Sequence, residues 1–245
     1  AVTAPGLEYP GYVGSGRGNT CLITNSGEGD VLLHSFASVN SGSLYLSFMF
    51  RVDSLPSTSS MGYGICFNPG DGRTSLNTQL YIKRLSDSSF SVGTRKYEGL
   101  AKHYSNDTFS TGQTYLAVLK YQFVAGADND TSSLYLFQYG VPAAEPPMPL
   151  VSSHDGPDFI NMAFVVLTNN YAQSPLFDGV KLRIDGIRVG TSWQSSVWAM
   201  PTSVHSGSRE SLIPLSNVPN PFRSHTSLQY ELPSRGWVLV QLLNA

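Results

Sequence analysis

The sequence has few charged residues and no long apolar run. Only 13% of its 245 residues are Asp, Glu, Lys or Arg, about half the usual share, and the formal net charge is -2. This balance offers no basic surface for DNA or RNA, so we expect no nucleic-acid partner. No stretch approaches the roughly 18 consecutive apolar residues of a membrane span, so we expect no membrane insertion. With 41% hydrophobic residues, the chain still has enough apolar side chains to build a core.

Cysteine is also scarce. The chain starts with Ala1 rather than Met, which favours an exported, mature product whose signal peptide has been removed, located outside the cell or on its surface. In that oxidising setting Cys21 and Cys66, the two cysteines of the sequence, are candidates for one disulfide. The alternative is that they are two unrelated buried thiols.

Sequence patterns of catalysis and metal binding are missing. The glutamates show no close pair along one strand, the five histidines lack the spacing of a zinc site, and a Gly-x-Ser-x-Gly motif is absent. We therefore expect a protein that is not an enzyme and holds no cofactor. Asp128-Asn129-Asp130 is the best group of oxygen ligands, and it fits either a calcium ion or a tight turn.

The strongest positive signal is an alternation of apolar and other side chains. It is clearest from Ser43 to Val52 and from Tyr115 to Val124. In the first of these segments the apolar set on one face is Leu44, Leu46, Phe48, Phe50 and Val52, opposite Tyr45, Ser47, Met49 and Arg51. Further short strands are separated by clusters of Gly, Pro, Asn and Asp. The pattern predicts an all-β fold, a two-sheet antiparallel jelly-roll sandwich with a C-terminal two-strand appendage.

Composition divides the chain into three parts. We expect the sandwich over residues 1–198, a linker rich in Ser and Pro over 199–216, and a β tail over 217–245. The strands of the tail are predicted at Thr226 to Leu232 and Trp237 to Leu243.

Two parts of the sequence resemble known families. Thr114 to Leu136 and Leu182 to Trp193, which ends in Ile-Arg-Val-Gly-Thr-Ser-Trp, resemble a concanavalin-A-like, laminin-G-like jelly-roll module of secreted Bacteroidota-type proteins. That resemblance implies a module often appended to enzymes or adhesins, without a general catalytic role. Asn217 to Phe222, Leu228 to Pro233 and Gly236 to Val240 are similar to the start of a type IX secretion C-terminal sorting domain.

The tail leads to the main functional hypothesis. An isolated pair of strands is marginal in water, so its apolar side chains need a partner. They are Leu228, Tyr230, Leu232, Trp237, Val238, Val240 and Leu242. The tail could fold back on its own sandwich or add a strand to another copy of the chain. We expect the second: a structural subunit that self-assembles into a filament or surface layer by strand donation.

Two other functions stay open at this point. Tyr135, Phe137 and Tyr139 alternate along one strand, which fits a lectin-like surface that binds glycans, or a core face. A polysaccharide-active enzyme is the second alternative.

Short acceptor patterns also predict glycosylation. They place attached glycans at Ser54, Asn106 and Asn129.

Overall fold

The chain is an antiparallel β protein, as the alternation predicted. The computed structural model describes residues 1–24, 31–55, 60–62, 64–70, 76–97, 99–168, 181–198, 215–218 and 227–230. Within these ranges, no helix has the length and apolar character needed to cross a membrane. The strands are β1 Val2–Thr3, β2 Thr20–Thr24, β3 Val31–Val39, β4 Ser43–Ser54, β5 Ser60–Gly62, β6 Ile65–Asn68, β7 Tyr81–Arg84, β8 Ser89–Thr94, β9 His103–Tyr104, β10 Phe109–Ser110, β11 Thr114–Gln122, β12 Thr131–Phe137, β13 Val151–Ser153, β14 Met162–Thr168, β15 Lys181–Gly190, β16 Leu215–Val218 and β17 Ser227–Tyr230.

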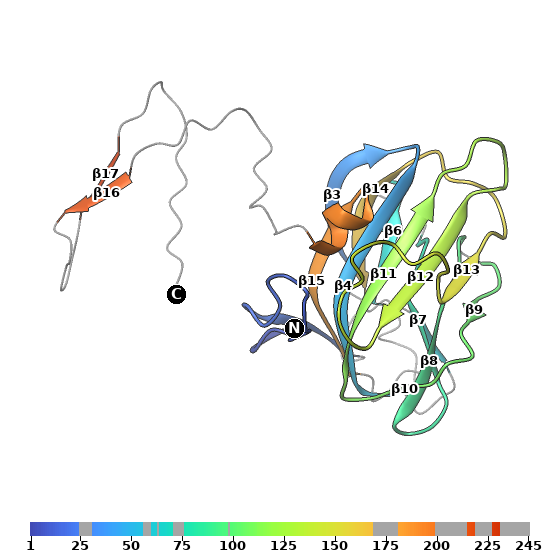
Figure 1. The fold of residues 1–245 in the computed structure, drawn as a ribbon, viewed down its shortest axis with the longest axis horizontal. Coiled ribbons are helices and arrows are strands. Elements are labelled where there is room, and N and C mark those ends of the chain that lie inside the picture. The colour runs from blue at the N-terminus through green and yellow to red at the C-terminus, as the bar shows by residue number, and fades with distance from the viewer. Residues whose placement is uncertain are drawn as a thin grey trace. The chain divides into compact units, whose positions relative to one another are not determined.

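A seven-stranded sheet forms one layer of the sandwich (Figure 1), in the order β1-β2-β15-β4-β11-β12-β13. Its centre is the pair β4 and β11, which runs in unbroken register from Arg51 opposite Thr114 to Ser43 opposite Gln122. Both strands were predicted from their alternation, within one or two residues at each end.

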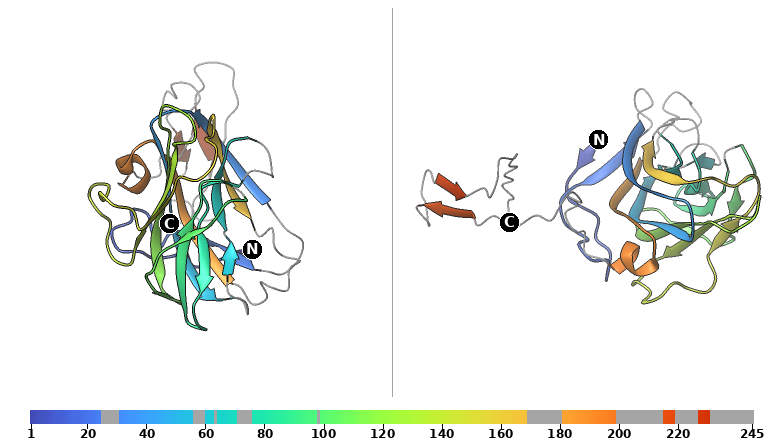
Figure 2. Two further views of the ribbon diagram at one scale, coloured as in Figure 1. Left: turned by 90° about the vertical axis from the view of Figure 1, so that its right-hand side faces the viewer. Right: turned by 90° about the horizontal axis from the view of Figure 1, so that it is seen from above.

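The smaller sheets form the second layer, which lies beside the first in the left view of Figure 2. One has the order β10-β8-β7-β5 with β9 beside β8, and the other has the order β3-β14-β6. An isolated bridge between Phe67 and Asn77 joins the two sheets. The register shifts by one residue between this bridge and the next pair, Gly62 with Tyr81. Thr78 lies in this irregularity with a left-handed backbone, φ 50°.

The core lies between the two layers. The predicted inner face of β4 is fully buried, because Leu44, Leu46, Phe48, Phe50 and Val52 all have 0% exposure. The Phe50 ring stacks on Tyr115 with centroids 5.6 Å apart and lies 6.4 Å from Phe90 of the second layer. Aromatic contacts therefore tie β4, β11 and β8 together across the sandwich.

The outer face of the seven-stranded sheet is covered as well. Tyr45 and Met49 are only 5% and 1% exposed, although the alternation placed them on the second, partly polar face of β4. They pack with residues of the N-terminal segment and with Trp193. The Trp193 indole, just before the short π-helix η2 Gln194–Trp198, donates to the Pro142 carbonyl at 3.0 Å. Segments remote in sequence therefore bury a face that the local pattern leaves open.

The predicted disulfide is wrong, since Cys21 and Cys66 are not bonded to each other. Cys21 packs against the main core from β2. Cys66 belongs to a separate small cluster with Leu76 and Val166, while its neighbours Ile65 and Phe67 face the main core. The two thiols thus lie on different sides of the second layer.

The C-terminal unit, Ser203–Ala245, contains a hairpin. Strand β17 Ser227–Tyr230 falls within the predicted strand from Thr226 to Leu232, and it pairs with β16 Leu215–Val218. Strand β16 begins inside the predicted linker. The second predicted strand lies outside the described residues, as do the partner-binding side chains Leu232, Trp237, Val238, Val240 and Leu242.

Replacing Phe50 by alanine tests the core. We expect Phe50→Ala to lower the free energy of unfolding by about 3–5 kcal/mol, because the cavity opens where both layers meet. Chemical denaturation measures this loss. Tyr139→Ala is the control: that side chain is 78% exposed, so it should change stability little. Equal stability of the two variants would contradict the described core.

Candidate functional site

The structure divides the aromatic stripe of β12, for which the sequence left open a glycan-binding surface or a core face. Tyr135 is 4% exposed and its ring contacts Trp193 with centroids 5.5 Å apart. The Phe137 ring packs against the same indole, with ring centroids 6.0 Å apart. Tyr139 lies beyond the end of β12 and is exposed. Two of the three rings therefore form core, and the stripe offers no common surface for a sugar.

Glu145 holds the proline-rich segment against this outer face. Its carboxylate accepts hydrogen bonds from Tyr45 and Tyr135, each at 2.6 Å, and pairs with Lys120 at 2.8 Å. Burial alone would raise the pKa of Glu145, but these donors outweigh burial and hold the pKa below its usual range. Both carboxylate oxygens of Glu145 thus accept hydrogen bonds inside the fold.

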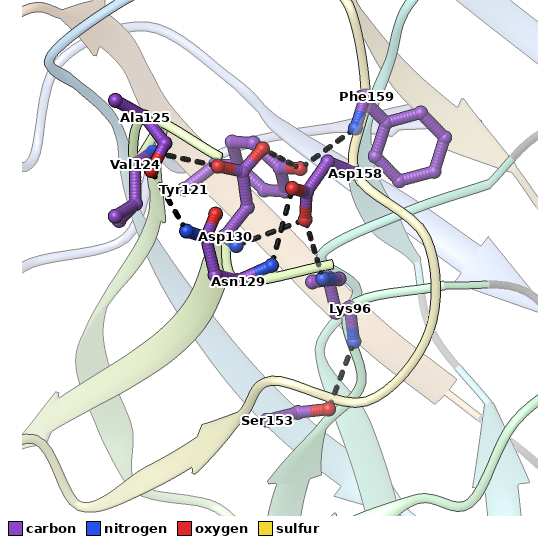
Figure 3. Close-up of polar contacts among 9 residues, drawn as sticks. All are labelled: Lys96, Tyr121, Val124, Ala125, Asn129, Asp130, Ser153, Asp158 and Phe159. Atoms are coloured by element: carbon purple, nitrogen blue, oxygen red, sulfur yellow. Dashed lines mark hydrogen bonds and ion pairs between the residues drawn. The ribbon is translucent and has the colours of Figure 1, made fainter. Parts of the chain in front are cut away.

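The acidic segment 128–130 forms a tight turn. Asp128 has a left-handed backbone, φ 57°, and the Asn129 side chain donates to the Ala125 carbonyl at 2.9 Å. Asp130 points inward, where Tyr121 Oη and the Val124 N–H donate to it at 2.7 and 2.6 Å (Figure 3). The described residues include no group of three or more acidic, His or Cys side chains able to hold a metal.

A buried ion pair lies beside this turn. Figure 3 shows Lys96, whose side chain is fully buried, bonded to Asp158 at 2.8 Å. The backbone N–H groups of Asn129 and Asp130 also donate to Asp158. Burial would raise the pKa of Asp158, but Lys96 and these N–H groups outweigh it and lower the pKa. The pair links the end of β8, the turn and the loop before β14.

The predicted glycosylation positions differ in accessibility. Asn106 is exposed between β9 and β10, and Ser54 is half-buried at the end of β4. The Asn129 side-chain nitrogen, the atom that would carry a glycan, already closes the turn. Glycosylation of all three stays a prediction.

A different group of side chains gathers on the second layer, on the face turned away from the core. We call it the cationic face. It consists of Gln79, Tyr81, Lys83, Arg95, Lys102 and Tyr104.

Strand pairing places these side chains together. Tyr81 of β7 and Tyr104 of β9 both pair with Gly93 of β8, one from each side. A Cβ at Gly93 would approach the His103 carbonyl to 2.3 Å and the Tyr104 ring to 2.7 Å. Glycine is therefore required there for β9 to lie against β8.

Cations cover both tyrosine rings of this face. The Arg95 guanidinium lies 5.2 Å and the Lys102 ammonium 4.8 Å from the Tyr81 centroid. Lys83 lies 5.6 Å from the Tyr104 centroid. None of the three forms an ion pair with a carboxylate in the described ranges. Desolvation, followed by the charge of Arg95, lowers the pKa of Lys102.

The cationic face carries buried polar atoms without a hydrogen-bond partner in the described residues, as does Asn129 in the turn. Arg95 Nε, Gln79 Nε2 and Tyr104 Oη have no hydrogen-bond partner within the described part of the chain. Gln79 is 0% and Arg95 9% exposed, and Gln79 uses only its oxygen, which accepts from Tyr81. Such groups are costly inside a protein and usually satisfied, so their presence here needs an explanation.

Sequence reasoning missed this face because its members are scattered over β7, β9 and the segments before β7, after β8 and before β9. Nothing in their spacing marks Tyr81 and Tyr104 as neighbours, and the cations carry no spacing motif. The alternation of Gln79, Tyr81 and Lys83 opposite the apolar Leu80 and Ile82 was the available signal.

Comparisons with known proteins agree with the fold. No protein-family model and no curated protein matches the sequence. Similar solved structures include a heptameric SAP-like pentraxin from Limulus polyphemus, with 12% identity, a TM-score of 0.42, and 78% of this chain and 75% of that chain covered. A legume lectin-like domain from Entamoeba histolytica has 12% identity, a TM-score of 0.37, and coverage of 78% and 88%. At these identities and TM-scores the likeness adds nothing to the antiparallel β-sandwich that the structure itself shows.

Alginate lyases are also among the similar structures. One from Pseudomonas aeruginosa has 14% identity and a TM-score of 0.37; the match covers 62% of this chain and 65% of the length of that lyase. Another is from Alteromonas sp. 272. These matches correct the expectation that the chain is not an enzyme. That expectation rested on linear spacing, and a β-sandwich joins residues from remote strands.

Removing one partner of the buried ion pair tests its role. We expect Asp158→Asn to cost about 3 kcal/mol of stability at pH 7, because Lys96 is left charged and buried. The depressed pKa of Asp158 sets the pH dependence. Its contribution is complete above the unfolded pKa of about 3.9 and is lost as the pH falls through the lower folded value. Denaturation of the unchanged chain and of Asp158→Asn between pH 7 and pH 3 measures this effect. The difference between their free energies of unfolding should become smaller as the pH falls.

Asp155→Asn is the matched control. Its partner His103, at 2.6 Å, and Asp155 itself are 38% and 42% exposed, so the loss should stay below about 1 kcal/mol. A larger loss for Asp155→Asn than for Asp158→Asn would contradict the assignment.

Proposed function

We propose that the chain binds carbohydrate on the cationic face, as a lectin-like protein. The observation that carries the proposal is the set of buried polar atoms without a partner, on Gln79, Arg95 and Tyr104. A sugar presents several hydroxyl groups, each of which accepts and donates hydrogen bonds. It can therefore satisfy convergent polar groups that the protein leaves unpaired.

The chemistry of this face favours a sugar over a protein partner. The centre of a protein interface is depleted of charged residues, whereas Lys83, Arg95 and Lys102 lie on this face together. Large apolar side chains do not occupy its other positions, which carry Gln and Tyr.

Self-assembly through the tail has weaker support. It rested on side chains of which most lie outside the described residues, and the described hairpin pairs β17 with β16. Strand donation, the sorting-domain resemblance and location outside the cell therefore stay predictions from the sequence. None of them is needed for sugar binding.

Removing one hydroxyl group tests the proposed site. We expect Tyr104→Phe to weaken binding about 2- to 10-fold, the value of a single hydrogen bond, for a glycan identified on an array. The thermal stability of Tyr104→Phe should not fall, because the lost hydroxyl has no partner in the described structure. Calorimetric titration and thermal unfolding measure the two effects.

Tyr139→Phe is the control and also tests the site predicted from the sequence. Loss of affinity in Tyr139→Phe but not in Tyr104→Phe would contradict the proposal. Each titration is followed by product analysis of the glycan. Cleavage that is lost in Tyr104→Phe would show that the same face acts on the bound polysaccharide.

A further inference from the structure

We infer that the ligand of the proposed carbohydrate site is an acidic glycan, an inference that rests on the proposed function. Arg95 determines this specificity by binding the carboxylate or sulfate group of the glycan. The inference depends on three observations about the cationic face. They concern its charge, the state of Arg95 and the arrangement of the cations.

The cations of the face form no ion pair with a carboxylate of the described residues. These cations are Lys83, Arg95 and Lys102. The whole chain is slightly acidic, with a net charge of -2, so this face departs from the average of the molecule. A neutral sugar would use the donors of the face but not its charge.

Arg95 is positioned to bind an anion. Its guanidinium carbon lies 5.2 Å from the Tyr81 ring centroid, within cation–π range, and the residue is 9% exposed. Its Nε has no partner in the described structure. A planar guanidinium matches the oxygens of a carboxylate or sulfate group with parallel hydrogen bonds. Gln79 Nε2 is a second donor beside the same tyrosine, because the side-chain oxygen of Gln79 accepts the hydrogen bond of the Tyr81 hydroxyl.

The other cations extend the site along the strands. Lys102 precedes β9, and Lys83 belongs to β7 and lies over Tyr104. Arg95 and Lys102 share the Tyr81 ring, whereas Lys83 lies over Tyr104 on the other side of β8, so the face offers two positions for acidic groups. This arrangement fits a polymer with an acidic group on successive residues. Bound anions would also raise the lowered pKa of Lys102.

Matched ligands test the acidic group itself. The intact chain is titrated with an oligouronate and with the same oligomer after its carboxyl groups have been reduced to alcohols. We expect the reduced oligomer to bind at least about 10-fold more weakly, since hydrogen bonds to charged groups are the stronger ones. Dextran sulfate and dextran form the second pair, which distinguishes sulfate from carboxylate as the source of the anion.

The outcomes separate this inference from the proposed function. Equal or tighter binding of both neutral members would overturn the acidic specificity and leave the carbohydrate site intact. Binding of no member of either pair would overturn both.

Variants test the role of Arg95. We expect Arg95→Gln to weaken binding of the acidic oligomer by about 10- to 100-fold and to leave the melting temperature unchanged or higher, because it removes a buried charge without a described partner. Arg17→Gln, at an exposed position, removes the same charge and should leave the affinity unchanged. Lys102→Gln, also exposed, should weaken binding of the acidic oligomer and reduce its dependence on salt.

A structural role of Arg95 would give the opposite pattern. If Arg95→Gln lowers the melting temperature but leaves the affinity unchanged, the inference is overturned. The same conclusion follows if Lys102→Gln binds the acidic oligomer as tightly as the unchanged chain.

Discussion

The pairing of β4 with β11 is the constraint on which the rest of the structure depends. Its inner side chains, such as Phe50, form the core with the second layer, and its outer ones, such as Tyr45, lie under Trp193 and the N-terminal segment. The seven-stranded sheet is thus used for packing on both faces near its centre. A ligand that meets polar side chains must bind elsewhere, and the cationic face of the second layer offers them.

The cationic face reduces the stability of the chain. Buried donors on Gln79, Arg95 and Tyr104, which have no partner among the residues that the structure describes, each oppose folding. The left-handed Thr78 adds backbone strain directly before Gln79. The fold holds these groups because strands β7 and β8 are fixed from the core side by Ile82, Phe90 and Val92. Costly polar groups held on rigid strands are what a preorganised binding site requires.

The fold could be predicted from the sequence far better than the site. Alternation along Ser43 to Val52 identified β4 and its buried face, because a strand that is half covered has a local period of two. The burial of Tyr135 could not be predicted, since it depends on Trp193, which is remote in sequence. The separation of Cys21 from Cys66 depends on which sheet each strand joins. The cationic face depends on three strands meeting at Gly93, which no linear spacing encodes.

A crystal structure of the chain with an acidic oligosaccharide tests the central claim most directly. The account predicts a carboxylate or sulfate oxygen within hydrogen-bond distance of Arg95 Nε, with a further ligand oxygen at Gln79 Nε2 or Tyr104 Oη. An oligosaccharide bound instead beside Tyr139, or on the cationic face with the three donors still unpaired, would contradict it.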